Sequence, residues 1–469
     1  MSAEIDTTTE DGGEPRRRLR DWLSSVAPEP PTSGWRRMVV AVVLVGVGSG
    51  AAGAVFWLLL HGVQHLALGA VSHGSVDTVA GVPLLRRVLA PAIAGLLCGL
   101  AWWWLRRHGG AEPVTTVLHD PDRRLAFART WFDAVLQTVV VGAGASIGRE
   151  GAPRQGAAAV ATWLSERLRL DRTERRLMVG AAAGAGLAAV YNVPLTGAVY
   201  VLEVLLVTRR WRAVVAALAV SGIATVTAWP VVGRHPVYPF PTTPVTAGTW
   251  VGALVAVPVT ALVGIAFART TSVSRHLTVH RPRLLPVTLT LAGAATGLAS
   301  WWLPTLPGNG KAVLDAAFVG SLTLLPAALL IAAKPAATAS WLWSGAAGGL
   351  LTPALATGAA TGAVVALLGP HVGLSISVPQ LALIMAVGVL AVTQRAPVFA
   401  ATFGIELTHP PALLWLVLVL TAVAARALAE AVRRRRPTAR RARGSSPRTA
   451  PASAAVGAPA RHRSRRPGR

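Results

Sequence analysis

The sequence predicts an all-α, polytopic membrane protein built from two inverted repeats with broken or re-entrant helices. Its 469 residues are 53% hydrophobic and 14% charged, with a mean hydropathy of +0.52, whereas soluble domains are about 25% charged. Apolar runs long enough to cross a hydrocarbon core of ~30 Å recur along the chain. Two pairs of short motifs also recur at nearly the same sequence separation, which indicates a duplicated transmembrane unit.

Helical spans are predicted from the apolar runs. The runs that reach spanning length are Met38–Trp57, Val88–Leu105, Leu177–Leu202, Trp250–Phe267 and Leu285–Trp302. Leu413–Ala425 is shorter and predicts a partial helix or one extended by its flanking residues. Glycine and alanine are abundant in the runs, and small residues let helices pack closely in lipid.

Prolines within apolar stretches interrupt these helices. They are Pro153, Pro194, Pro353 and Pro397. Irregular backbone at membrane depth is tolerated only where it is buried in protein or lines a cavity. The prolines therefore predict half-helices whose ends meet at a site, and the alternative is a set of merely kinked helices.

The charge distribution predicts orientation. Arginines are concentrated before the first span and in the last segment of the chain, and the net charge is +25. Positive flanking segments stay cytoplasmic, so both termini are expected inside a multi-pass cell-membrane protein with an even number of crossings. No apolar h-region of a secretory signal peptide is found in residues 1–35.

These patterns divide the chain into five segments. They are a cytoplasmic N-terminal segment (1–37), a first transmembrane repeat (38–210), a connecting helix and linker (211–246), a second transmembrane repeat (247–430) and a basic cytoplasmic tail (431–469). The composition of the tail predicts disorder and contact with anionic membrane lipid. Because the tail lacks interleaved aromatic residues, nucleic acid is not an expected partner.

The duplicated motifs locate a candidate site. Gly148–Pro153 matches Gly348–Pro353 at an offset of 200 residues, and Pro194–Glu203 matches Pro397–Glu406 at an offset of 203. In transporters built from repeats, the site lies at the repeat interface. Broken helices point their N-termini at anions, because those ends carry free N–H groups and a partial positive charge. The pattern therefore predicts an anion site between the repeats.

Glu150 is the most informative residue of the first motif. A charged residue inside hydrocarbon costs about 2.5–3.5 kcal/mol on insertion scales, so its retention indicates use. The alternative is a structural ion pair with Arg149 or another arginine. Adjacent residues do not face each other on a helix, which disfavours the pairing with Arg149.

Read in order, these motifs resemble the CLC family of voltage-gated chloride channels and chloride/proton antiporters. The resemblance covers roughly residues 38–430, with Ala152 where the family usually has proline. The matching segments are Gly148–Gln155, Asn192–Glu203, Ser344–Pro353, Lys334 with Thr338, and Arg395–Pro397. The resemblance implies a homodimer in which each subunit has its own pore for chloride or a similar monovalent anion.

The resemblance also implies roles for individual residues. The carboxylate of Glu150 would act as a gate that competes with the anion. The anion would be bound by backbone amides near Arg149, Glu150, Gly151, Leu350 and Leu351. Gly110 stands where the family has a central-site serine, and the family's C-terminal tyrosine ligand has no counterpart, so a wider or less selective inner pore is expected.

One further departure concerns proton coupling. Family antiporters carry a second glutamate directly after the position of Glu203, and here that residue is Val204. Valine cannot carry a proton, which favours a passive channel. The alternative is a proton-coupled antiporter that uses Glu203 as the inner relay. A structural interpretation is also open, in which Glu203 is a buried carboxylate with its hydrogen bonds satisfied or lies at the end of a helix.

Other classes are less well supported. Gly144–Gly148 matches the nucleophile-elbow pattern of serine hydrolases around Ser146, but no histidine motif accompanies it. No metal-binding or Walker signature occurs, so neither an enzyme nor any cofactor or metal is expected. A non-transporting membrane scaffold is a remaining alternative.

Overall fold

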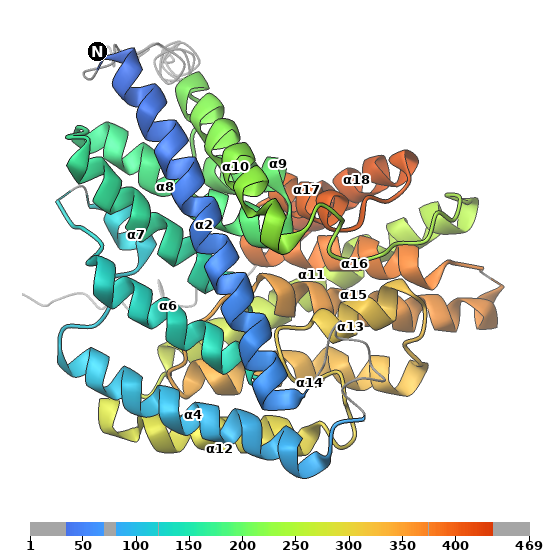
Figure 1. Cartoon of the computed structure of the whole chain (residues 1–469). Helices are drawn as coiled ribbons and strands as arrows, with labels where there is room; N and C mark the ends of the chain where they lie inside the picture. The colour runs from blue at the N-terminus through green and yellow to red at the C-terminus, as the bar shows by residue number, and fades with distance from the viewer. Residues whose placement is uncertain (1–33, 70–80, 121, 374, 435–469) are drawn as a thin grey trace, which may run out of the picture. The chain divides into compact units, whose positions relative to one another are not determined.

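A computed structural model describes residues 34–69, 81–120, 122–373 and 375–434 (Figure 1). Within these residues the chain is helical and contains no strand, only one isolated bridge. One compact unit extends to Ala429, and the second unit is described only at the end of the last helix. Most of the predicted end segments, 1–33 and 435–469, lie outside the described residues.

The order of helices in the first half recurs in the second. The first half contains α2 (Trp35–Leu68), α4 (Leu84–Arg107), α5 (Val114–His119), α6 (Phe127–Gly142), α7 (Gly151–Arg167), α8 (Arg172–Tyr191), α9 (Pro194–Tyr200) with the π-helical turn η1 (Val201–Leu205), and α10 (Trp211–Val232). The second contains α11 (Ala247–His276), the 3-10 turn η2 (Pro282–Leu284), α12 (Leu285–Ala299), α13 (Lys311–Phe318), α14 (Leu324–Trp343), α15 (Leu351–Leu368), the 3-10 turn η3 (Gly369–Val372), α16 (Val378–Gln394), α17 (Pro397–Thr408) and α18 (Ala412–Arg434). The helices that follow the first motif pair, α7 and α15, start 200 residues apart.

Seven of the described helices are long and apolar enough to cross a membrane, judged by length and composition. The short predicted run at Leu413–Ala425 is extended by its flanking residues into α18. The run Leu177–Leu202 differs from a single span, because α8 ends at Tyr191 and α9 begins at Pro194. Between them Asn192 adopts a left-handed conformation with φ 55°. Asparagine tolerates this conformation, and proline lacks the N–H that would continue a helix.

The same break occurs in the second half. Arg395 ends α16 in the left-handed region with φ 57°, and Pro397 begins α17. Proline suits a first helical position, because its missing N–H would have no intrahelical acceptor there. The prolines therefore produce the half-helices that the sequence predicts, and not kinks within continuous spans.

Small residues bring helices together, as the pair α4 and α12 illustrates (Figure 1). A Cβ atom at Gly95 of α4 would collide with the backbone of Leu289, and one at Gly293 of α12 would collide with the backbone of Pro91. In lipid the hydrophobic effect does not drive helices together, so close packing of this kind stabilises their association instead.

Candidate functional site

The two loops of the first motif pair meet in space. Gly148 and Gly349 form an antiparallel bridge, in which each backbone N–H donates to the other residue's carbonyl, at 2.8 and 3.0 Å. The loops lead directly into α7 and α15. Two helix N-termini from different repeats are therefore held side by side.

The carboxylate of Glu150 lies at this junction. Glu150 is the residue before α7, but its side chain reaches the start of α15. Oε1 accepts a hydrogen bond from the backbone N–H of Leu351 at 2.5 Å, and Oε2 accepts one from the Thr352 hydroxyl at 3.4 Å. The side chain is 0% exposed. The partial positive charge of the α15 N-terminus favours a negative group there, so the position can hold a carboxylate or a competing anion.

Two glycines leave the space that this carboxylate fills. A Cβ atom at Gly148 or at Gly349 would overlap the Glu150 side chain. The glycines of the motifs are thus required by the close approach of the backbone to a negative group.

Arg149 forms no ion pair with Glu150. Its guanidinium lies over the ring of Tyr191, with Cζ 4.6 Å from the centroid, and its Nε is buried without a hydrogen-bond partner. Among the described residues, no lysine or arginine forms an ion pair with the Glu150 carboxylate. The direct hydrogen bonds to the carboxylate therefore come from Leu351 and Thr352, at the start of α15.

A cavity of about 500 Å³ reaches this junction. We call it the inner cavity. Its lining includes two of the predicted site residues, Gly110 and Gly151, together with Gly348 of the second motif. Leu350 and Leu351 lie at the start of α15, and Leu350 lines a separate cavity of about 310 Å³. The predicted anion-binding residues therefore gather around the start of α15 and the inner cavity.

Arg154 is a residue of the inner cavity that the sequence analysis missed. It lies one turn after Glu150 on α7, where its Nε donates to the Glu150 carbonyl at 2.8 Å. Its Nη1 donates to the Tyr200 hydroxyl. The available signal was an arginine four residues after Glu150, just before the apolar stretch 156–161.

A buried polar cluster fixes α7 against α6 beside the same cavity. The carboxylate of Asp133 accepts hydrogen bonds from Trp102 at 2.7 Å, Gln137 at 2.7 Å and Gln155 at 3.0 Å. Three donors satisfy this carboxylate without an arginine partner, as burial of a charge requires.

The second motif pair also joins the repeats. Glu203, in the π-helical turn, accepts hydrogen bonds at 3.3 and 2.6 Å from the backbone N–H groups of Val398 and Phe399, in the first turn of α17. Its counterpart Glu406 accepts bonds at 3.0 and 2.6 Å from Leu195 and Thr196, in the first turn of α9. Each glutamate therefore caps the short helix of the other repeat.

Two remaining residues have simpler surroundings. Val204 is partly buried and packs against the main apolar core.

Ser146 is 0% exposed, and its hydroxyl has no hydrogen-bond partner within the described part of the chain. A serine nucleophile needs a base within hydrogen-bond reach, and this geometry gives Ser146 none.

The comparisons with known proteins all indicate the same class of membrane protein. A family model described as voltage gated chloride channel matches residues 94–430. A putative chloride channel protein ClcB-like of Ralstonia nicotianae is 31% identical over 395 residues, which cover 79% of this chain and 89% of that protein. The voltage-gated ClC-type chloride channel ClcB of Yersinia pestis is 29% identical over 411 residues, which cover 83% and 97%.

Solved structures share the fold. A slow cyanobacterial Cl⁻/H⁺ antiporter is similar with a TM-score of 0.71 and 22% identity, covering 87% of this chain and 96% of that one. A CLC-type fluoride/proton antiporter has a TM-score of 0.68 and 19% identity, covering 86% and 98%. Together with the helical architecture, these likenesses confirm the predicted all-α, two-repeat membrane fold.

Proposed function

The chain belongs to the voltage-gated chloride channel family, and from this membership we propose that it conducts chloride or a similar monovalent anion passively, with Glu150 as the gate. The observation that carries the proposal is the Glu150 carboxylate, which occupies the N-terminus of a helix from the opposite repeat. A mobile anion competes for the same donors. Conduction requires that the side chain leaves this position, by protonation or by displacement.

The surroundings of Glu203 support passive conduction. Val204 follows it and cannot carry a proton. Both carboxylate oxygens of Glu203 already accept backbone hydrogen bonds at the α17 N-terminus. The side chain is therefore engaged as the cap of a helix from the other repeat, which supports a structural role over a relay.

The gate is tested by Glu150→Gln in purified protein reconstituted into liposomes. Glutamine has no negative charge, so we expect constitutive chloride efflux that no longer depends on pH. Glu166→Gln is the matched control, because Glu166 lies exposed near the other end of α7 and pairs with Arg124 at the surface. If the wild-type pH dependence persists in Glu150→Gln, the gate lies elsewhere.

A second candidate is proton-coupled anion exchange with Glu203 as the inner relay. Two solved proteins of the same fold, described as Cl⁻/H⁺ and fluoride/proton antiporters, favour it. A chloride gradient across the liposome membrane separates the candidates. Passive conduction moves no protons uphill, whereas sustained uphill proton movement that disappears in Glu203→Gln establishes exchange.

The remaining elements of the proposal concern the assembly and its location. We propose a homodimer in the cell membrane, with both termini cytoplasmic and the arginine-rich tail on anionic lipid. Crosslinking in liposomes tests the dimer, and protease protection of tagged termini tests the orientation.

Retained flux in Ser146→Ala, together with the absence of hydrolysis, would separate a conducting protein from a serine enzyme.

A further inference from the structure

We propose that the inner cavity contains an oxyanion subsite in which Arg154 binds a planar monovalent oxyanion, with nitrate as the probe. The inference rests on the proposed anion conduction and adds its substrate class. It also assigns a ligand to the part of the path where Gly110 supplies no side chain.

The first argument is the charge of the cavity. Three guanidinium groups line it, those of Arg106, Arg154 and Arg275. Within the described part of the chain, none of the three forms an ion pair with a carboxylate. The hydrogen-bond acceptors of Arg106 and Arg154 are carbonyls and one phenol, which carry no opposite charge.

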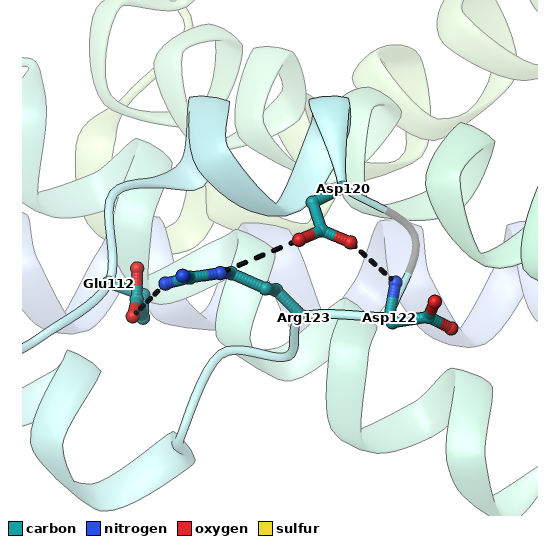
Figure 2. Close-up of polar contacts among 4 residues, drawn as sticks. All are labelled: Glu112, Asp120, Asp122 and Arg123. Carbon is teal, nitrogen blue, oxygen red and sulfur yellow. Dashed lines mark hydrogen bonds and ion pairs between the residues drawn. The ribbon is translucent and has the colours of Figure 1, made fainter. Parts of the chain in front are cut away.

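The acids of the same cavity are already bound elsewhere. Glu112 receives a hydrogen bond at 2.7 Å from Arg123, which also lies 3.6 Å from Asp120 (Figure 2). Asp133 is satisfied by one tryptophan and two glutamine donors. Asp133 keeps its single negative charge, because its donors are uncharged, and it attracts Arg106. Three guanidiniums against this one unpaired carboxylate still leave the cavity with an excess of positive charge suited to an anion.

The second argument is the availability of donors. A guanidinium has five N–H groups in a planar fork. Arg154 uses Nε and Nη1 within the protein, and Arg106 uses Nη2 on the Gly345 carbonyl at 2.5 Å. No guanidinium nitrogen of either residue is both buried and unpaired. The nitrogens without a protein partner are therefore accessible.

The third argument is the space that the cavity offers to an anion. A Cβ atom at Gly110 would meet no atom within 4 Å, so the cavity wall is open at this position. The cavity volume of about 500 Å³ far exceeds the requirement of a four-atom anion. A larger anion than a halide fits without rearrangement of the wall.

The shape of the ligand follows from the neighbouring gate. There a planar carboxylate presents one oxygen to the Leu351 N–H and the other to the Thr352 hydroxyl. A planar oxyanion has oxygens at similar spacing, so it can replace the carboxylate oxygen for oxygen. The fork of Arg154 matches the same geometry, since guanidinium groups bind planar oxyanions through paired N–H donors. A halide offers only a single acceptor point.

Equilibrium anion binding to the purified protein in detergent tests the proposal without any need for flux. Nitrate and chloride are titrated calorimetrically, and the wild type is expected to bind nitrate more tightly. Arg154→Lys keeps the charge but removes the fork, so it should weaken nitrate binding about tenfold while chloride binding changes less. Arg167→Lys is the control, because Arg167 is exposed at the end of α7 and stacks on Trp163.

Each outcome separates the hypotheses. An unchanged nitrate-to-chloride ratio in a monodisperse Arg154→Lys protein overturns the subsite, even if Glu150-gated chloride flux is intact. Nitrate binding that depends on Arg154 in a protein without flux supports the subsite and removes the conduction proposal. If the variant fails to fold, the affinities of the wild type decide. A wild type that binds chloride more tightly than nitrate contradicts a planar monovalent ligand. A wild type that binds sulfate more tightly than both anions contradicts it as well.

Discussion

Thr352 determines how firmly the carboxylate of Glu150, the proposed gate, is held in its present position. Leu351 donates a backbone N–H, which substitution cannot remove, but the second donor is a side-chain hydroxyl. Thr352 is 0% exposed, so its hydrogen bond is shielded from bulk solvent. At 3.4 Å the bond is long, so its contribution lies at the lower end of the range for charged acceptors, about 1.5 kcal/mol.

Thr352→Val should therefore open the gate more often. Valine keeps the shape of threonine and removes the donor, so the closed position of Glu150 loses about 1.5 kcal/mol and chloride efflux rises about tenfold. Liposome efflux measures this. Thr357→Val is the control, because the Thr357 hydroxyl, also on α15, bonds only to the Pro353 carbonyl, at 2.9 Å. Equal efflux from wild type and Thr352→Val would show that the hydroxyl does not hold the gate.

At the scale of elements, two short helices are stabilised across the repeats. The helices α9 and α17 contain only 7 and 12 residues, and isolated helices of this length are marginal. Each starts with proline and has no cap from its own preceding residue. Glu406 and Glu203 supply the missing acceptors, and their negative charge suits the positive helix ends.

Removal of either charge should destabilise the protein without removing the gate. We expect Glu406→Gln to lower the free energy of unfolding by about 1–2 kcal/mol, since glutamine has one acceptor oxygen and no charge. Thermal unfolding in detergent measures the loss, with the exposed Glu166→Gln as control. A Glu406→Gln protein as stable as the wild type would argue that the cap is replaced by solvent, while Glu150-dependent flux should persist in either case.

The half-helices were predictable because their signals are local. Glycine followed by proline marks the starts of α7 and α15, and Asn192 and Pro194 mark the break between α8 and α9. The partners were not predictable, because Thr352 reaches Glu150 and Glu406 reaches α9 across about 200 residues of sequence. Arg154 was missed for the same reason. Its neighbours in the cavity come from several helices, and no spacing within α7 reveals them.

At the scale of the whole molecule, the site exists only where the two repeats meet. One repeat supplies the carboxylate, and the other supplies the donors that bind it. The bridge between Gly148 and Gly349 sets their separation. A change on either side of the bridge should therefore act on the gate, although neither glycine has a side chain of its own.

Gly349→Ala tests this dependence. The added methyl would overlap the Glu150 carboxylate, so the carboxylate must leave the α15 N-terminus or the bridge must open. In both cases the closed state is lost, and chloride efflux should approach that of Glu150→Gln. Gly222→Ala is the matched control, because a Cβ atom at this α10 position meets nothing within 4 Å. The double variant Gly349→Ala/Glu150→Gln should conduct no faster than Glu150→Gln alone, since both changes act on one gate. Additive increases would show that Gly349 affects the path at a second point, and wild-type efflux from Gly349→Ala would contradict a gate held between the repeats.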